Sequence, residues 1–286
     1  MQTLEIIKWP LLACLLLPWL LGYLGLHVVR RGVIFVDLAL AQVAALGTCV
    51  SILMGHDVHD TASYVWSVSF TLVGATLFAL TRSEKQRVPQ EALIGIVYVV
   101  SAALGILLLS KSAEGKEELQ RSLVGELLVV SPAEIWRTFG LYALIGVVHF
   151  IFRARFLELS QFAGRDEVHG TKASTSSAWW DFFFYALFGL VVTSFVHVGG
   201  VLLTFSYLIV PAVCAAYLVD SLRSQIIVAW CCSTVASVGS LWVTAVADLP
   251  IGATIVCGLG LLLALVIVYC RWIKRPATDP IQSKPT

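Results

Sequence analysis

The sequence predicts an all-α polytopic membrane protein of about nine transmembrane helices, and its charge content and charge distribution carry this prediction. Of the 286 residues, 58% are hydrophobic and only 13% are charged, whereas soluble domains average about 25% charged residues. Eight stretches of the chain contain no charged residue, and most of them approach or exceed the ~20 residues that a helix needs to cross a bilayer. Soluble, nucleic-acid-binding and disordered proteins are therefore excluded, and the net charge of +1 predicts no nucleic acid partner.

The charge-free stretches place nine spans in a single transmembrane domain, residues 1–286. The stretch 182–219 is 38 residues long, enough for two passes, and we divide it at 197–200 (HVGG) because glycine permits the positive φ of a tight turn. Residues 248–250 (DLP) divide the last two spans, and Pro250 suits the first turn of a helix. The predicted spans lie near 10–29, 33–54, 62–81, 92–110, 134–152, 179–197, 199–219, 225–246 and 250–271.

The basic residues predict the orientation, because Lys and Arg gather on the cytoplasmic side of membrane proteins. With a cytoplasmic C-terminus, fourteen of the nineteen basic residues lie inside: Arg30, Arg31, Arg82, Lys85, Arg87, Arg153, Arg155, Arg165, Lys172, Arg223, Arg271, Lys274, Arg275 and Lys284. The other five lie outside: Lys8, Lys111, Lys116, Arg121 and Arg137. We therefore expect the N-terminus outside and the C-terminus in the cytoplasm.

Two segments are neither spans nor short loops. Residues 111–133 begin polar and become apolar too briefly to cross the membrane, so we expect an external, partly re-entrant segment. Residues 153–178 form the longest internal segment, whose first half has the spacing of a short amphipathic helix. Such a helix either rests on the membrane surface or docks onto another protein, and composition leaves both open. Its candidate contact residues are Phe156, Leu157, Leu159, Phe162 and Gly164.

Asp37 is the carboxylate that lies a full turn inside an unambiguous span. A charge near the bilayer centre costs ~2.5–3.5 kcal/mol on insertion scales, so Asp37 is a candidate functional residue. The alternative is a structural ion pair with Arg30 or Arg31. Gln42 lies ~140° around the same helix from Asp37, so both side chains can reach one ion only across a local π-bulge. Asp181 opens a later span, where a helix N-terminus favours a carboxylate, and we expect it to be structural.

The outer loop 55–60 gathers side chains that suit zinc, manganese or iron. We take His56, Asp57 and His59 as candidate metal contacts, against the alternative that a short polar loop has this composition by chance. The histidines within the spans, His27, His149 and His197, are scattered, and we expect them to pack or to form hydrogen bonds.

The sequence contains none of the common motifs for nucleotide binding or for hydrolytic catalysis. It has no G-x-x-x-x-G-K-[ST] nucleotide-binding loop, no H-E-x-x-H metalloprotease motif and no plausible Ser-His-Asp set. The seven cysteines form no C-x-x-C pair, which favours buried thiols over disulfides or zinc ligands. The chain is therefore expected not to be an enzyme, and its energy source must be a partner or an ion gradient.

Four stretches of the sequence, at 36–47, 91–110, 199–218 and 247–266, resemble the membrane permeases of bacterial ABC importers for zinc, manganese and iron. VDLALAQVAALG (36–47), after two arginines, is similar to the family's Arg-rich turn and Asp-containing helix, and EALIGIVYVVSAALGILLLS (91–110) to the segment that enters the fourth span. GGVLLTFSYLIVPAVCAAYL (199–218) and ADLPIGATIVCGLGLLLALV (247–266) resemble its G-V-L-L and D-L-P-x-G-A signatures. The similarity covers essentially the whole chain. The signature positions are Gly200, Pro211, Asp248, Pro250 and Gly252.

The resemblance implies a type II ABC importer permease in the bacterial plasma membrane, working as a homodimer. Two cytoplasmic ATPase subunits would bind ATP beneath it, and an extracytoplasmic metal-binding protein would deliver the ion. The helix within 156–168 would then be the coupling helix that enters a groove on the ATPase. The chain itself would bind no cofactor, and the metal would be its substrate.

The sequence departs from the family at the intramembrane site. The family helix usually carries Asp and His four residues apart as metal ligands, but alignment on Gly47 places Gln42 at the His position and Leu38 at the Asp position, with Asp37 one residue early. Glutamine offers a neutral carbonyl oxygen and is a poor zinc ligand beside imidazole. We expect zinc as cargo, with manganese or iron next. A permease for a metal chelate and a proton-coupled secondary transporter that uses Asp37 stay open as alternatives.

Overall fold

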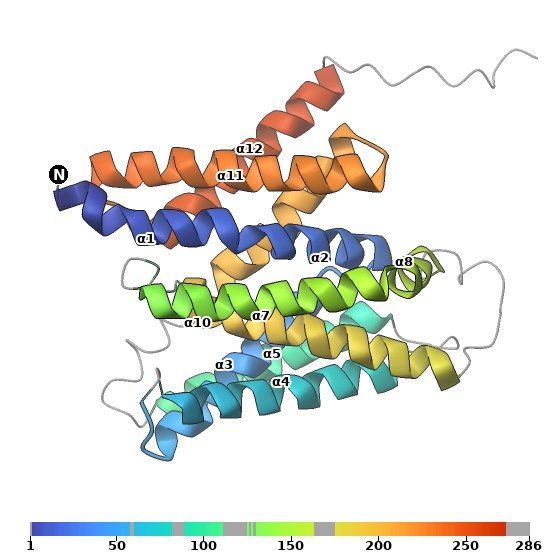
Figure 1. The fold of residues 1–286 in the computed structure, drawn as a ribbon. Helices are drawn as coiled ribbons and strands as arrows, with labels where there is room; N and C mark the ends of the chain where they lie inside the picture. The colour runs from blue at the N-terminus through green and yellow to red at the C-terminus, as the bar shows by residue number, and fades with distance from the viewer. Residues whose placement is uncertain are drawn as a thin grey trace, which may run out of the picture.

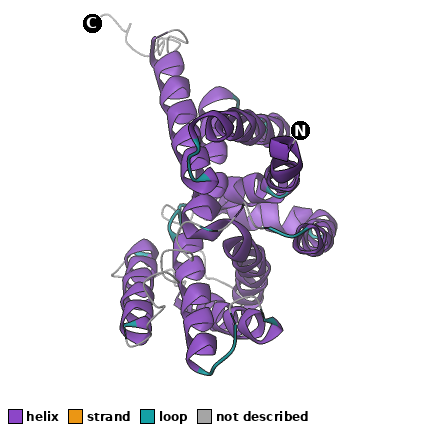
Figure 2. Cartoon of the chain, turned by 90° about the vertical axis from the view of Figure 1, so that its left-hand side faces the viewer, coloured by secondary structure: helices purple, strands orange, loops and turns teal. Residues whose placement is uncertain are grey.

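The computed structural model describes residues 2–57, 60–81, 89–110, 125, 127, 130–162 and 175–272. These residues form long helices joined by short loops, without strands (Figures 1 and 2). The helices are α1 (Gln2–Leu16), α2 (Pro18–Arg31), α3 (Val36–Leu53), α4 (Thr61–Thr81), α5 (Gln90–Leu109), α7 (Pro132–Ile151), α8 (Arg153–Phe162), α10 (Thr175–Leu218), α11 (Leu222–Ala247) and α12 (Ile251–Trp272). Eight helical stretches among the described residues are long and apolar enough to cross a membrane. The predicted all-α membrane architecture is confirmed.

The first predicted span is a helix with one interruption. The apolar stretch runs from Lys8 to Arg31, but α1 ends at Leu16 and α2 begins at Pro18. Proline has no backbone N–H to donate into the helix and therefore interrupts its hydrogen-bond ladder. In Figure 1, α1, α2, α4, α7 and α11 run nearly parallel or antiparallel, and α8 lies beside the end of α2.

Helix α10 contains two of the predicted spans, because the chain turns back at Gly200. The φ and ψ angles of Gly200 are 75° and 170°, which no helix contains. The rings of Phe195 and Tyr207 lie 5.8 Å apart, although twelve residues of continuous α-helix would separate them by ~18 Å. We call residues 175–199 the first arm and residues 201–218 the second arm of α10. The break predicted at 197–200 is confirmed, so nine predicted spans correspond to eight long helices.

Gly125 lies against this turn. Its φ is 74°, and a Cβ added there would overlap the backbone of Gly199. Nearby, Leu127 is buried in the hydrophobic core. The described part of the segment 111–133 therefore packs onto the α10 turn, while residues 111–124 lie outside the described residues. That the segment is external stays a prediction.

Small residues let the helices approach closely, as in other membrane bundles. A Cβ at Gly25 of α2 would overlap the carbonyl oxygen of Leu208 in the second arm of α10. A Cβ at Gly47 of α3 would come within 2.7 Å of the Trp66 carbonyl oxygen of α4. The two glycines therefore allow α2 to pack closely against the second arm of α10, and α3 to pack closely against α4.

We predict that Gly25→Ala lowers the free energy of unfolding by about 1–3 kcal/mol, because the methyl group forces α2 away from α10. Thermal unfolding of the purified protein in detergent measures the change. Gly140→Ala is the matched control, since a Cβ at Gly140 meets nothing within 4 Å. Equal stability of the two variants would contradict this account of the packing.

Candidate functional site

Asp37 lies in the first turn of α3 and is 1% exposed. Its Oδ1 accepts a hydrogen bond of 2.7 Å from the backbone N–H of Leu38, as expected at a helix N-terminus, where unpaired N–H groups favour a carboxylate. Its Oδ2 is buried and has no hydrogen-bond partner among the described residues. A carboxylate oxygen without a partner inside the chain can bind an ion or a proton.

The alternative ion pair between Asp37 and an arginine does not form within the described residues. Arg31 instead pairs with Asp181 of α10 at 3.1 Å, and Arg30 donates a hydrogen bond of 2.8 Å to Gln225 of α11. Asp181 was expected at the N-terminus of a span, but α10 begins at Thr175, so Asp181 lies inside the helix and forms an ion pair with an arginine instead. Because Arg31 binds Asp181 and Arg30 binds Gln225, neither arginine binds Asp37, and the Oδ2 of Asp37 stays without a partner among the described residues.

Gln42 is buried on the same helix but cannot share an ion with Asp37 within one copy of the chain. Helix α3 is regular from Val36 to Leu53, so the π-bulge that would align the two side chains is absent. Five residues of regular helix place them ~140° apart around the axis. Gln42 is 6% exposed and is therefore buried on a different side of α3 from Asp37.

The outer loop is a polar turn at the start of α4. His56 and Asp57 are exposed, and the N–H of Asp57 donates to Asp60 Oδ2 at 3.0 Å. Ser63 donates to the carbonyl oxygen of Asp57 at 2.6 Å. His59 lies outside the described residues, and no group of three His, Cys, Asp or Glu side chains within the described part of the chain could hold a metal. A metal contact in this loop stays a prediction.

The predicted amphipathic helix is α8, but its apolar side faces the chain itself. Phe156 is fully buried, stacked on His149 of α7 with ring centroids 4.5 Å apart. Leu157 and Leu159 are half-buried. Phe156 therefore packs inside the chain's own core, and the expectation that these residues of α8 couple the chain to an ATPase stays a prediction. The Phe162 side chain and Gly164 lie outside the described residues.

The surface that α8 presents is charged. Arg155 and Glu158 are exposed and form an ion pair at 3.2 Å, with 64% and 49% of their side chains accessible. These residues lie on the side of α8 away from Phe156. The prediction from the sequence named only the apolar residues of this helix and not its charged face. The alternation of charged and apolar residues in 153–160 would have indicated both faces.

Four of the five signature residues lie at turns or at the ends of helices, and Pro211 lies inside a helix. Besides Gly200 at the α10 turn, Pro211 lies within the second arm. Asp248 ends α11 in the left-handed conformation, φ 51°, and its N–H donates to the Thr244 carbonyl oxygen at 2.9 Å. Aspartate tolerates this conformation better than most residues. Pro250 precedes α12, and Gly252 is buried in its first turn.

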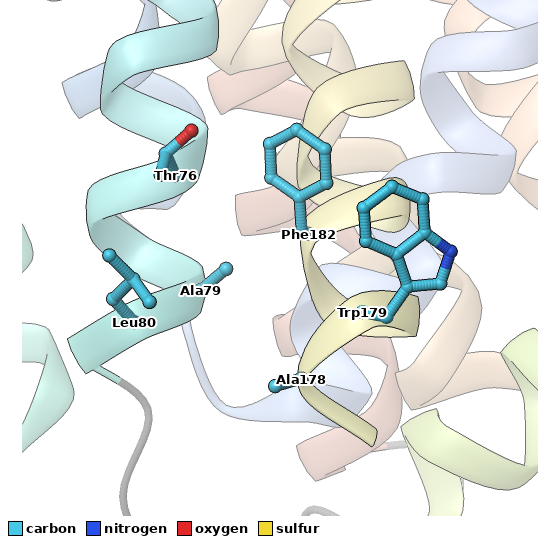
Figure 3. A pocket seen from close by; sticks show the side chains of 6 residues that line it. All are labelled: Thr76, Ala79, Leu80, Ala178, Trp179 and Phe182. Carbon is cyan, nitrogen blue, oxygen red and sulfur yellow. The ribbon is translucent and has the colours of Figure 1, made fainter. Parts of the chain in front are cut away.

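A groove of about 300 Å³ lies between α4 and the first arm of α10 (Figure 3). Its lining is almost entirely apolar, and the one hydroxyl, that of Thr76, donates to the Leu72 carbonyl of its own helix. Such a lining cannot hold a metal ion and suits hydrocarbon. The residues that line it are Thr76, Ala79, Leu80, Ala178, Trp179 and Phe182.

Comparison with known proteins agrees with this architecture, and the sequence profile of the ABC 3 transport family matches residues 3–271. The chain belongs to the ABC 3 transport family. The manganese transport system membrane protein MntC of Listeria innocua is 26% identical over 263 residues, which are 92% of this chain and 88% of that protein. The manganese import system permease protein ScaB of Streptococcus parasanguinis is 22% identical over 257 residues, 90% of this chain and 88% of that protein.

A solved structure supports the fold of this ABC 3 family member. PsaBC from Streptococcus pneumoniae in complex with Fab is similar over 93% of each chain, with a TM-score of 0.74 and 22% identity. The resemblance to the membrane permeases of bacterial metal ABC importers is therefore confirmed. This ABC 3 family chain is a multi-pass protein of the bacterial plasma (inner) membrane.

We predict opposite effects of neutralising the two buried carboxylates. Asp181→Asn leaves the buried Arg31 without its charged partner and should lower the free energy of unfolding by about 3 kcal/mol. Asp37→Asn removes a carboxylate with an unpartnered oxygen and should keep that free energy equal or raise it by about 1 kcal/mol. Thermal unfolding of the purified chain in metal-free detergent solution checks both. A large loss of stability in Asp37→Asn would show that Asp37 is a structural residue.

Proposed function

We propose that this chain is the permease subunit of an ATP-driven importer for a divalent transition metal ion. One observation carries the proposal: Asp37, in a chain of this family, is buried inside the bundle with a carboxylate oxygen that no described residue pairs with. A buried carboxylate without a partner is costly in a membrane protein and is retained where it binds a substrate ion or a proton. Asp37 is therefore the group that would bind the ion in transit.

Manganese is the first cargo to test, ahead of zinc and iron. The relatives MntC and ScaB are named as manganese proteins. The buried polar side chains of α3, Asp37 and Gln42, offer oxygen atoms, and carboxylate and carbonyl oxygens suit manganese better than they suit zinc, which favours nitrogen and sulfur ligands. This chemistry moves the expectation from zinc to manganese.

Two copies of the chain would form the pathway between them. Since Asp37 and Gln42 of one α3 point in different directions, a second copy can supply further oxygen atoms to an ion bound at Asp37. The transported ion would arrive from an extracytoplasmic metal-binding protein docked over the outer loops, past His56 and, outside the described residues, His59.

Energy would come from a cytoplasmic ABC ATPase that binds and hydrolyses ATP, so the chain itself would be a transport subunit and not an enzyme. The exposed Arg155 and Glu158 of α8 would contact a groove on that ATPase. ATP binding and hydrolysis would move α8 and switch access to Asp37 between the two sides of the membrane.

Uptake of radioactive manganese by cells that express the chain with its partners tests this function. Asp37→Ala should reduce uptake about tenfold or more, because the carboxylate that binds the ion is lost. Asp220→Ala is the control, since Asp220 is an exposed carboxylate between α10 and α11 and should leave uptake unchanged. Full uptake in Asp37→Ala would remove Asp37 from the mechanism.

The energy source separates this proposal from a proton-coupled transporter. An ATP-driven importer should keep importing manganese after a protonophore collapses the proton gradient, as long as cellular ATP is held constant, and an ATPase should co-purify with the chain. Uptake that stops with the proton gradient, without a co-purifying ATPase, would favour Asp37 as a proton carrier. Competition between free and chelated manganese in the same assay shows which form is carried.

A further inference from the structure

Ser160 of α8 lies at the centre of a buried polar junction. It is 2% exposed, and its hydroxyl oxygen lies 2.8 Å from the Phe156 carbonyl oxygen, 2.8 Å from His27 Nδ1 and 3.3 Å from Arg31 Nε. A serine hydroxyl has one proton to donate and two lone pairs to accept. These three contacts therefore saturate it: Ser160 donates to Phe156 and accepts from His27 and Arg31.

Arg31 extends the junction from α2 to α10. Its Nη1 donates to Asp181 Oδ1 at 3.1 Å, and its guanidinium carbon lies 3.8 Å from the centre of the Phe184 ring. The planar guanidinium thus bonds α8 through one nitrogen and the first arm of α10 through another. A lysine could keep the ion pair, but its three donors sit on one nitrogen, so it lacks the planar fork that presents separate nitrogens to Ser160 and to Asp181.

Aromatic packing holds α8 on the same side. Phe156 stacks on His149 of α7 and lies 6.1 Å, ring centre to ring centre, from Phe183 of α10. Helix α8 is therefore attached to α2, α7 and α10 by its buried side, while Arg155 and Glu158 lie exposed on the other side.

The junction lies one short turn away from Asp37. Gly32, with φ 67°, ends α2 directly after Arg31, and α3 begins at Val36. The turn is held to α5 by the N–H of Ile34, which donates to Glu91 at 2.8 Å. Within the turn, the Val33 N–H donates to the Val28 carbonyl oxygen at 3.4 Å and the Val36 N–H donates to the Val33 carbonyl oxygen at 3.2 Å. These bonds tie the end of α2 to the start of α3, so a displacement of Arg31 would be passed on to the helix that carries Asp37.

We infer that Ser160, Arg31 and Asp181 are positioning residues that make α8, α2 and the first arm of α10 move as one unit and link this unit to the helix that carries Asp37. The inference rests on the proposed function, in which an ATPase moves α8. None of the three residues binds the ion or ATP. Their role is to convert a motion of α8 into a change in which side of the membrane has access to Asp37.

The ratio of manganese imported to ATP hydrolysed, measured with the complete complex in proteoliposomes, tests this inference. Ser160→Ala should still assemble with the ATPase and hydrolyse ATP, while the ratio falls about fivefold or more. Ser160→Thr, which keeps the hydroxyl, should restore the ratio. Ser237→Ala is the matched control, because Ser237 is also a fully buried hydroxyl with a hydrogen-bonded partner, Tyr207, at 2.6 Å, and its ratio should stay unchanged.

Arg31→Lys provides a second variant with the same readout if Ser160→Ala does not accumulate, since lysine keeps the charge opposite Asp181. An unchanged ratio in these variants would overturn the inference. So would a loss of uptake and of ATP hydrolysis in proportion to a lower unfolding temperature, which a merely structural role predicts. Absence of ATP-dependent uptake in the unmodified complex would instead overturn the proposed function itself, and the inference with it.

Discussion

The buried ion pair between Arg31 and Asp181 organises one end of the helix bundle. It joins residues 150 positions apart in the chain, and both side chains are almost inaccessible, at 1% and 3%. Removing one member of such a pair leaves an uncompensated charge in a low-dielectric interior, which costs far more than an exposed pair contributes. The positions of α2, α8 and α10 relative to one another therefore depend on this contact. Ser160 and Phe184 complete the surroundings of the guanidinium.

The same contact explains why Asp37 has an available oxygen. Arg31 is bound to Asp181 and Arg30 to Gln225, so neither neutralises the carboxylate that begins α3. Two buried carboxylates near the same end of the bundle thus have different surroundings, one paired and one with an unpartnered oxygen. This difference in surroundings is the basis for proposing that Asp37, rather than Asp181, binds the transported ion.

The regular features of the fold could be predicted from the sequence. The charge-free stretches located the spans, because a helix in lipid has to exclude charge along its length, and the paired glycines located the α10 turn, because only glycine adopts φ 75°, ψ 170° readily. The short helix α8 was also predicted from its apolar spacing. The packing of Phe156 against His149 could not be predicted, since amphipathic spacing shows that one face is apolar but not which surface covers it. The sequence could not establish how the Asp37 and Gln42 side chains are placed around α3, because only the three-dimensional structure shows that this helix has no π-bulge.

By itself, the sequence determined that this protein is a helical membrane protein, because hydropathy and charge placement are local properties that any part of the chain displays without its neighbours. Its resemblance to the metal ABC importer permeases, and not its hydropathy, indicated the family. Only the tertiary structure decided which polar groups satisfy one another. The contact of Ser160 with His27 joins positions 133 residues apart, and no spacing along the chain encodes such a pairing. The available oxygen of Asp37 is likewise a property of the packed bundle, since it exists only because the nearby arginines are bound by side chains from α10 and α11.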